Sequence, residues 1–121
     1  MTDLLRGRIY RAHLSHLGED KYFLVVSNNR RNLAFQQVLA ARLTTTPPRS
    51  PRKAMVQLDR REVMTGWVSC DDILALYDDE VRADVGALTV QGMFRVEAGL
   101  RAALDLPDQA PGAAGPASRS S

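Results

Sequence analysis

Short runs of β-branched and aromatic residues, each closed by turn-forming residues, extend over most of this chain of 121 residues. These strand-like segments are residues 8–14, 22–27, 35–46, 54–58 and 66–70. Residues 73–76 either extend the last segment or follow it as another strand. Five or more short strands bury a common core best when their sheet curls on itself. The sequence therefore predicts a mainly β fold.

One helix is well marked near the end of the chain. Thr89 is a candidate N-cap, and apolar side chains follow it at helical spacing. These side chains are Val90, Met93, Val96, Leu100, Ala103 and Leu104. Gly92 and Gly99 lower the helix propensity, so packing against the sheet has to hold this helix in place. We expect an α+β protein, a small and partly open barrel with a C-terminal helix.

The remaining segments are predicted to be turns and loops. Asn28 to Asn32 interrupt the strand pattern as a turn, and the proline-rich residues 47–53 form an exposed basic loop. A further helical turn over residues 78–83 is weakly indicated. Residues 107–121 are mostly Pro, Gly, Ala and Ser, and we expect them to be disordered. One folded domain, residues 1–106, is therefore predicted.

Composition narrows the class of protein. Charged residues make up 25% and hydrophobic residues 45% of the chain, as in ordinary globular proteins. The longest apolar run, residues 22–26, is too short to cross a bilayer, and no secretory leader is recognisable. Cys70 is the only cysteine, which excludes an internal disulfide and a cysteine metal cluster. We expect a cytoplasmic protein without a membrane segment.

Charge is distributed unevenly along the chain. Between Arg30 and Arg61 there are eight basic residues and one acidic residue, Asp59. Between Glu62 and Asp84 there are seven acidic residues and one basic residue, Arg82. Such asymmetry suits a surface that binds a polyanion, although a merely solvated basic surface explains the charge equally well.

Several segments, in order, resemble the MazF/PemK family of toxins from type II toxin–antitoxin systems. Residues 6–10 are similar to the family's first strand, "RGDIY", and residues 21–29 to its "RPVLVVSND" segment. Residues 39–45 resemble its "VVAPITS" strand, and residues 66–73 resemble a later strand that ends in "DQI". The predicted helix after Thr89 stands where the family's last helix does. The resemblance extends from about Arg6 to Leu106.

The resemblance implies a fold, an activity and partners. The fold is an SH3-like barrel of the MazF/CcdB kind, assembled as a homodimer. The implied activity is sequence-specific cleavage of single-stranded RNA without a metal or other cofactor, leaving a 2′,3′-cyclic phosphate and a 5′-hydroxyl. The implied partners are that RNA and a cognate antitoxin. Carried over residue by residue, the family's catalytic arginine and threonine correspond to Lys21 and Thr44.

The proposed chemistry gives each of these residue types a task. Without a metal, the adjacent 2′-hydroxyl is the nucleophile, so the protein must neutralise charge on the phosphoryl oxygens and move two protons. Lys21 is a cation but lacks the bidentate fork of arginine, and Thr44 offers a hydroxyl. His16 and Glu19, in the preceding loop, are candidates for proton transfer. The alternatives are an edge-strand charge for Lys21, an ordinary strand residue for Thr44 and a solvated loop for His16.

RNA binding is assigned to basic, amide and hydroxyl side chains. We expect phosphate contacts from arginine and lysine, and base-edge contacts from asparagine unless the asparagines only shape the turn. The predicted RNA-binding residues are Asn28, Asn29, Arg30, Arg31, Arg42, Thr45, Arg49, Arg52 and Lys53. Trp67 and Phe35 are aromatic and could stack on bases, but Trp67 lies in an apolar strand and fits the core or a dimer interface better.

Two other functions remain open at this level. The same barrel could bind RNA or an antitoxin peptide without cutting, because a lysine replaces the family's arginine. A gyrase-directed toxin on this barrel is the third reading, and it rests on analogy of fold alone.

Overall fold

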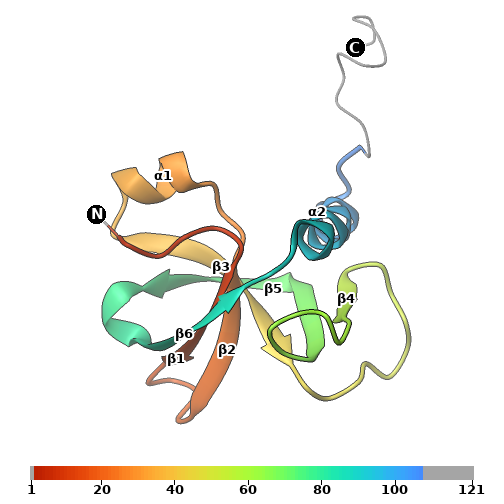
Figure 1. The fold of residues 1–121 in the computed structure, drawn as a ribbon, viewed down its shortest axis with the longest axis horizontal. Coiled ribbons are helices and arrows are strands. Elements are labelled where there is room, and N and C mark those ends of the chain that lie inside the picture. Colours follow the sequence, from red (N-terminus) through yellow and green to blue (C-terminus); the bar gives the residue numbers. More distant parts are fainter. Residues whose placement is uncertain (1, 108–121) are drawn as a thin grey trace, which may run out of the picture.

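The computed structural model describes residues 2–107 and contains six strands that form one antiparallel sheet. In chain order the elements are β1 (Arg8–His13), β2 (Asp20–Val25), α1 (Asn29–Ala34), β3 (Gln37–Thr44), β4 (Met55–Leu58), β5 (Gly66–Tyr77), a 3₁₀ turn η1 (Asp78–Glu80), β6 (Val81–Ala87) and α2 (Val90–Leu104). The strand order is β4-β5-β3-β2-β1-β6. A mainly β fold with a C-terminal helix is confirmed (Figure 1). The predicted tail, apart from Pro107, lies outside the described residues.

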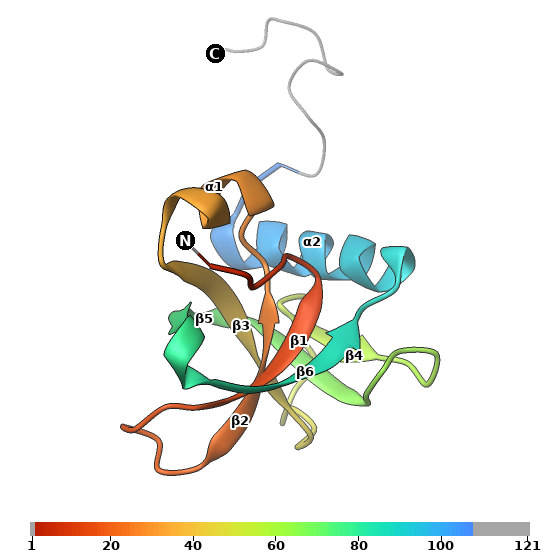
Figure 2. The same cartoon turned by 60° about the vertical axis from the view of Figure 1, so that its left-hand side comes forward.

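Both faces of the curved sheet carry apolar clusters. One cluster, which includes Leu24, Leu43 and Val68, packs under α2 through Val96 (Figure 2). The other cluster includes Phe23, Val25 and further side chains of the opposite face. Neighbouring residues of β2 therefore belong to different cores, and Phe23, Leu24 and Val25 are all fully buried. This explains why residues 22–26 form an unbroken apolar run, as expected for a strand buried on both faces.

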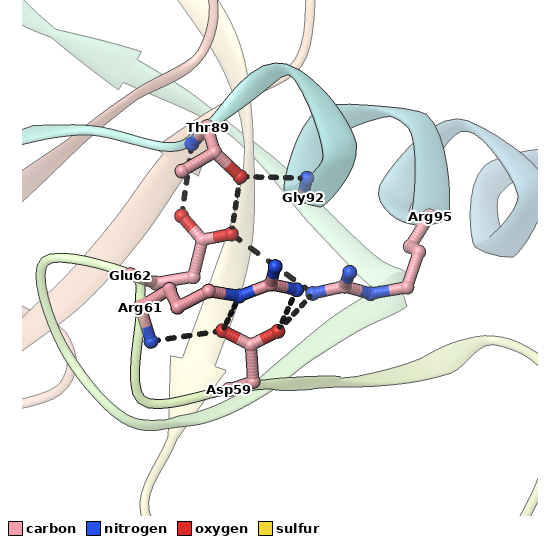
Figure 3. A network of polar contacts seen from close by, with 6 residues as sticks. All are labelled: Asp59, Arg61, Glu62, Thr89, Gly92 and Arg95. Atoms are coloured by element: carbon pink, nitrogen blue, oxygen red, sulfur yellow. Dashed lines mark hydrogen bonds and ion pairs between the residues drawn. The ribbon is translucent and has the colours of Figure 1, made fainter.

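Helix α2 forms as predicted, and its first turn is anchored by buried polar groups. The Thr89 hydroxyl accepts the Gly92 N–H at 3.0 Å. Glu62, from the loop after β4, accepts the Thr89 N–H at 2.8 Å and the Thr89 hydroxyl at 2.6 Å (Figure 3). The Glu62 side chain is only 1% exposed, and Arg95 lies 3.9 Å from its Oε2. The helix start is thus fixed to the loop beneath it.

Two glycines of α2, Gly92 and Gly99, let the helix approach the sheet and the loop of Glu62 closely. A Cβ on Gly99 would lie 2.6 Å from Val56 Cγ2 and 2.8 Å from Cys70 Sγ. Burial raises the pKa of the Cys70 thiol to about 11, so this thiol stays protonated and unreactive. Of the apolar residues predicted to line the helix, Val96 is buried and Met93 and Leu100 pack beside it. Val90 and Leu104, at the two ends of the helix, remain exposed.

One local prediction is wrong and another is confirmed only in part. Asn28 to Asn32 were expected to form a turn, but Asn28 accepts the Arg31 N–H at 2.7 Å and so caps a short helix, α1. The helical turn weakly indicated at residues 78–83 is confirmed for η1, but β6 begins at Val81. This strand pairs with β1 at the edge of the sheet. None of its residues is fully buried, but Val81, Ala83 and Val85 alternate with exposed Arg82 and Asp84, a strand signal that the prediction from the sequence did not use.

Candidate functional site

Lys21 and Thr44 lie beside each other on neighbouring strands. Tyr22 pairs with Leu43, so the next position outward brings the start of β2 against the end of β3. Tyr22 and Leu43 belong to the cluster under α2, so Lys21 and Thr44 project from the opposite face. The edge-strand explanation of Lys21 is wrong, because β2 lies between β1 and β3 inside the sheet.

Lys21 offers a positive charge at this point, and Thr44 offers a hydroxyl hydrogen. Lys21 Nζ lies 3.2 Å from Glu19 Oε2, and the lysine side chain is 27% exposed. The Thr44 hydroxyl accepts the Thr46 N–H at 3.1 Å and, among residues 2–107, donates no hydrogen bond. Its hydrogen is therefore available to an acceptor that enters from solvent. An ammonium and a hydroxyl donor at one point suit a phosphoryl group.

A cleft of about 240 Å³ surrounds this pair. Arg42, two residues before Thr44 on the same strand face, contributes a second cation. The cleft is lined by Asp20, Lys21, Tyr22, Arg42, Leu43, Thr44, Thr45, Thr46 and Met64. Four predicted residues therefore meet here: Lys21, Arg42, Thr44 and Thr45. Sequence reasoning missed Asp20, whose only signal is its place next to Lys21, and Met64, which comes from a distant loop.

The two candidates for proton transfer are placed differently. Glu19 is 67% exposed and does not itself line the cleft, but it forms an ion pair with Lys21, which does. His16 is exposed in the loop between β1 and β2 and does not line the cleft. The other histidine, His13, contacts Asp20 Oδ1 through Nδ1 at 2.9 Å.

The predicted residues of α1 lie away from the cleft. Helix α1 follows the end of β2 that is remote from Lys21, and Figure 2 shows it at the opposite end of the β2–β3 pair from the β1–β2 loop. Asn28 caps this helix, and Asn29 Oδ1 accepts the Arg6 N–H at 2.8 Å. Arg31 donates to Gln37 Oε1 at 2.8 Å and covers the Phe35 ring, while Arg30 is exposed. Contacts within the protein occupy three of these four side chains.

The predicted basic loop between β3 and β4 leads directly out of the cleft. Arg49, Arg52 and Lys53 are all exposed there. Arg52 forms an ion pair of 3.2 Å with Asp71 of β5. A hydrogen bond from the Ser69 hydroxyl, together with the Arg52 charge, holds the pKa of the Asp71 carboxyl below its usual range. Asp71 therefore stays ionised and neutralises Arg52, which leaves Arg49 and Lys53 as the more available cations of this loop.

Other surfaces offer less to the predicted chemistry. A larger groove of about 990 Å³ lies between α2 and β4, but Lys53 is the only predicted site residue that lines it. Within residues 2–107, no three His, Cys, Asp or Glu side chains gather as metal ligands would. None of the helices in that range is long and apolar enough to cross a membrane.

An antiparallel sheet crossed by one helix, with two cations and three threonines in a single cleft, defines a small β protein built to bind an anionic ligand. The sequence model of the PemK-like, MazF-like toxins of type II toxin–antitoxin systems matches residues 5–104, and the chain belongs to this family. The resemblance seen in the sequence is thereby confirmed.

Individual relatives support the same assignment. The chain is 38% identical over 107 residues to endoribonuclease MazF4 of Mycobacterium tuberculosis and to endoribonuclease MazF1 of Mycobacterium bovis, covering 88% of this chain and 98% of each relative. A solved mycobacterial endoribonuclease in complex with its cognate antitoxin is 37% identical, with a TM-score of 0.79 over 88% of this chain and 99% of that one.

Proposed function

We propose that this chain is a toxin that acts as an endoribonuclease, cutting single-stranded RNA at short specific sequences in the cytoplasm without a metal ion. The observation that carries the proposal is the position of Lys21 and Thr44, each one residue beyond the Tyr22–Leu43 pair of adjacent strands, inside a polar cleft that also holds Arg42. The 38% identity to curated endoribonucleases over almost their whole length supports the same class of enzyme.

The proposed reaction needs no group other than RNA and side chains. The 2′-oxygen attacks the adjacent phosphorus and the bond to the 5′-oxygen breaks, which yields a 2′,3′-cyclic phosphate and a 5′-hydroxyl. Lys21 and Arg42 neutralise the charge that grows on the phosphoryl oxygens, and the Thr44 hydroxyl donates to one of them. One proton leaves the 2′-hydroxyl and another joins the 5′-oxygen. We assign these transfers to Glu19, which pairs with Lys21, and to His16 in the same loop.

RNA binding around the phosphate follows the cleft and its basic loop. Arg42 and Thr45 are proposed to contact RNA inside the cleft, and Arg49, Arg52 and Lys53 beyond it. Asn28, Asn29, Arg30 and Arg31 remain predicted contacts for a longer RNA that reaches α1. Because these contacts go to phosphates, binding should weaken strongly as salt rises.

The test is cleavage of a long single-stranded transcript by purified protein in the presence of EDTA. We expect discrete fragments whose 5′ ends carry hydroxyls and whose 3′ ends carry cyclic phosphates. Intact RNA at every protein concentration would refute the enzyme. Salt-sensitive RNA binding without any cut would favour the binding-only reading instead.

We also infer that the chain forms a homodimer and binds a cognate antitoxin. Val90 and Phe94 on one side of α2 are 82% and 69% exposed, an apolar surface of the kind that a partner covers. A relative of 37% identity was solved with its cognate antitoxin bound. Light scattering should give twice the mass of one chain, and Phe94→Ser should shift this mass toward the monomer. A monomeric wild-type protein at micromolar concentration would contradict the dimer.

A further inference from the structure

A row of side chains crosses four strands on the face that carries Lys21 and Thr44. Thr44 pairs with Trp67 of β5, and Trp67 pairs in turn with Gln57 of β4. The next pair inward, Leu43 and Val68, lies in the cluster under α2. Because side chains alternate along strands, Thr44 and Trp67 project together from the opposite face. The row therefore runs Lys21, Thr44, Trp67 and Gln57, across the strands.

A glycine holds Trp67 against the catalytic threonine. Gly66 begins β5 with a φ of +133°, and a Cβ there would lie 2.7 Å from the Thr44 carbonyl oxygen. Only glycine allows this approach. The start of β5 therefore packs flush against the end of β3, and the backbones carrying Thr44 and Trp67 are about 4.8 Å apart, the usual strand spacing.

Trp67 is placed to present an aromatic surface beside the cleft. The side chain is partly exposed and belongs to neither apolar cluster, so of the two expected places, core or dimer interface, the core is excluded and the interface stays a prediction. Beside it, Gln57 is exposed and Ser69 is half-buried. An indole at the edge of a cationic cleft matches the way single-stranded nucleic acids are held, with phosphates on cations and bases on aromatic rings.

We propose that Trp67 stacks on the base of the nucleotide next to the phosphate held by Lys21 and Thr44. The RNA then crosses the strands from β2 toward β4, and the Gln57 amide can donate to and accept from the edge of the next base. Stacking is largely independent of the base, so Trp67 contributes affinity, whereas the hydrogen bonds of Gln57 contribute base specificity. This inference rests on the proposed ribonuclease function.

Tryptophan fluorescence reports on this site alone, because Trp67 is the only tryptophan in the chain. The probe is a short oligonucleotide that spans a cleavage site mapped for the wild-type enzyme, with a 2′-deoxy sugar in place of the attacking hydroxyl. We expect this probe to quench Trp67 fluorescence in a saturable manner. Trp67→Leu should weaken probe binding, measured by anisotropy, roughly 10- to 100-fold and raise KM more than it lowers kcat. Trp67→Phe should stay within a few-fold of wild type.

The control is Tyr77→Leu, which removes an exposed aromatic from the other end of the same strand and should change neither binding nor cleavage. Trp67 fluorescence that does not change when the probe is added, but changes with protein concentration, would overturn the inference and assign Trp67 to a subunit interface. Unchanged KM and binding in Trp67→Leu would overturn it as well. In both cases the wild-type enzyme still cuts RNA, whereas failure of the proposed function appears as no cleavage by any variant.

Discussion

Replacing Lys21 with alanine is expected to lower the rate of RNA cleavage about 100- to 1,000-fold, the usual effect of removing one group that stabilises transition-state charge. Lys21 lies on a central strand, one residue beyond the Tyr22–Leu43 pair, and it lines the same cleft as Thr44. Its side chain belongs to neither apolar cluster, so the variant should keep its Tm. Single-turnover cleavage of the mapped site, measured beside thermal unfolding, separates loss of chemistry from loss of fold.

Two conservative variants make this result specific. Lys21→Arg restores the fork that grips a phosphate at two points and should cut at least as fast as wild type. Thr44→Val keeps the shape of the threonine but loses its hydroxyl, so we expect cleavage to be abolished, whereas Thr44→Ser should retain it. Arg101→Ala, which removes a cation from α2 on the other side of the sheet, is the matched control and should leave the rate unchanged. Wild-type rates in both Lys21→Ala and Thr44→Val would exclude this cleft as the active site.

Replacing Glu62 with alanine is expected to lower the free energy of unfolding by about 3 kcal/mol, because two hydrogen bonds to a buried carboxylate are lost. The Thr89 N–H and hydroxyl both donate to Glu62, and the hydroxyl caps α2 in turn (Figure 3). Tm should fall by roughly 15 °C in a domain of this size. Arg61→Ala, which breaks an exposed ion pair with Asp59 in the same loop, should leave Tm nearly unchanged.

Gly92 allows a sharper test of the same contact. A Cβ there would lie 2.3 Å from Glu62 Oε2, so Gly92→Ala should destabilise the wild-type protein. In the Glu62→Ala background that oxygen is absent, and the higher helix propensity of alanine should then make Gly92→Ala stabilising by up to about 1 kcal/mol. Urea unfolding of the wild type, the two single variants and the double variant measures whether the effect of Gly92→Ala on the free energy of unfolding reverses its sign. Additive effects of the two changes would mean that Glu62 and Gly92 do not pack together.

Local patterns were enough to predict β1 to β5, the last helix and its cap. The apolar run at residues 22–26 and the spacing after Thr89 are properties of adjacent residues, and the structure confirms both elements. The patterns failed where weak local preferences were overruled. Asn28 caps α1 because its side chain reaches the Arg31 N–H, and β6 forms because β1 offers it an edge to pair with.

The residues of the candidate site were also predicted only in part. Lys21, Arg42, Thr44 and Thr45 were named from the sequence, through resemblance to a family to which the chain belongs, and they do line one cleft. Asp20 and Met64 were not named, because nothing in their local sequence marks them. The asparagines and arginines of α1 were named for RNA but lie at the far end of the β2–β3 pair, a separation set by strand direction.

The sequence by itself determined where β1 to β5 and α2 would form and which chemical groups the chain would offer a polyanion, because periodicity and residue type are local. Only the tertiary structure decided what three glycines do. Gly66, Gly92 and Gly99 looked neutral or unfavourable in the sequence, yet each stands where a Cβ would meet another segment at less than 3 Å. Such contacts join residues far apart in the chain, so their energy appears only after the strands have paired and the helix has docked.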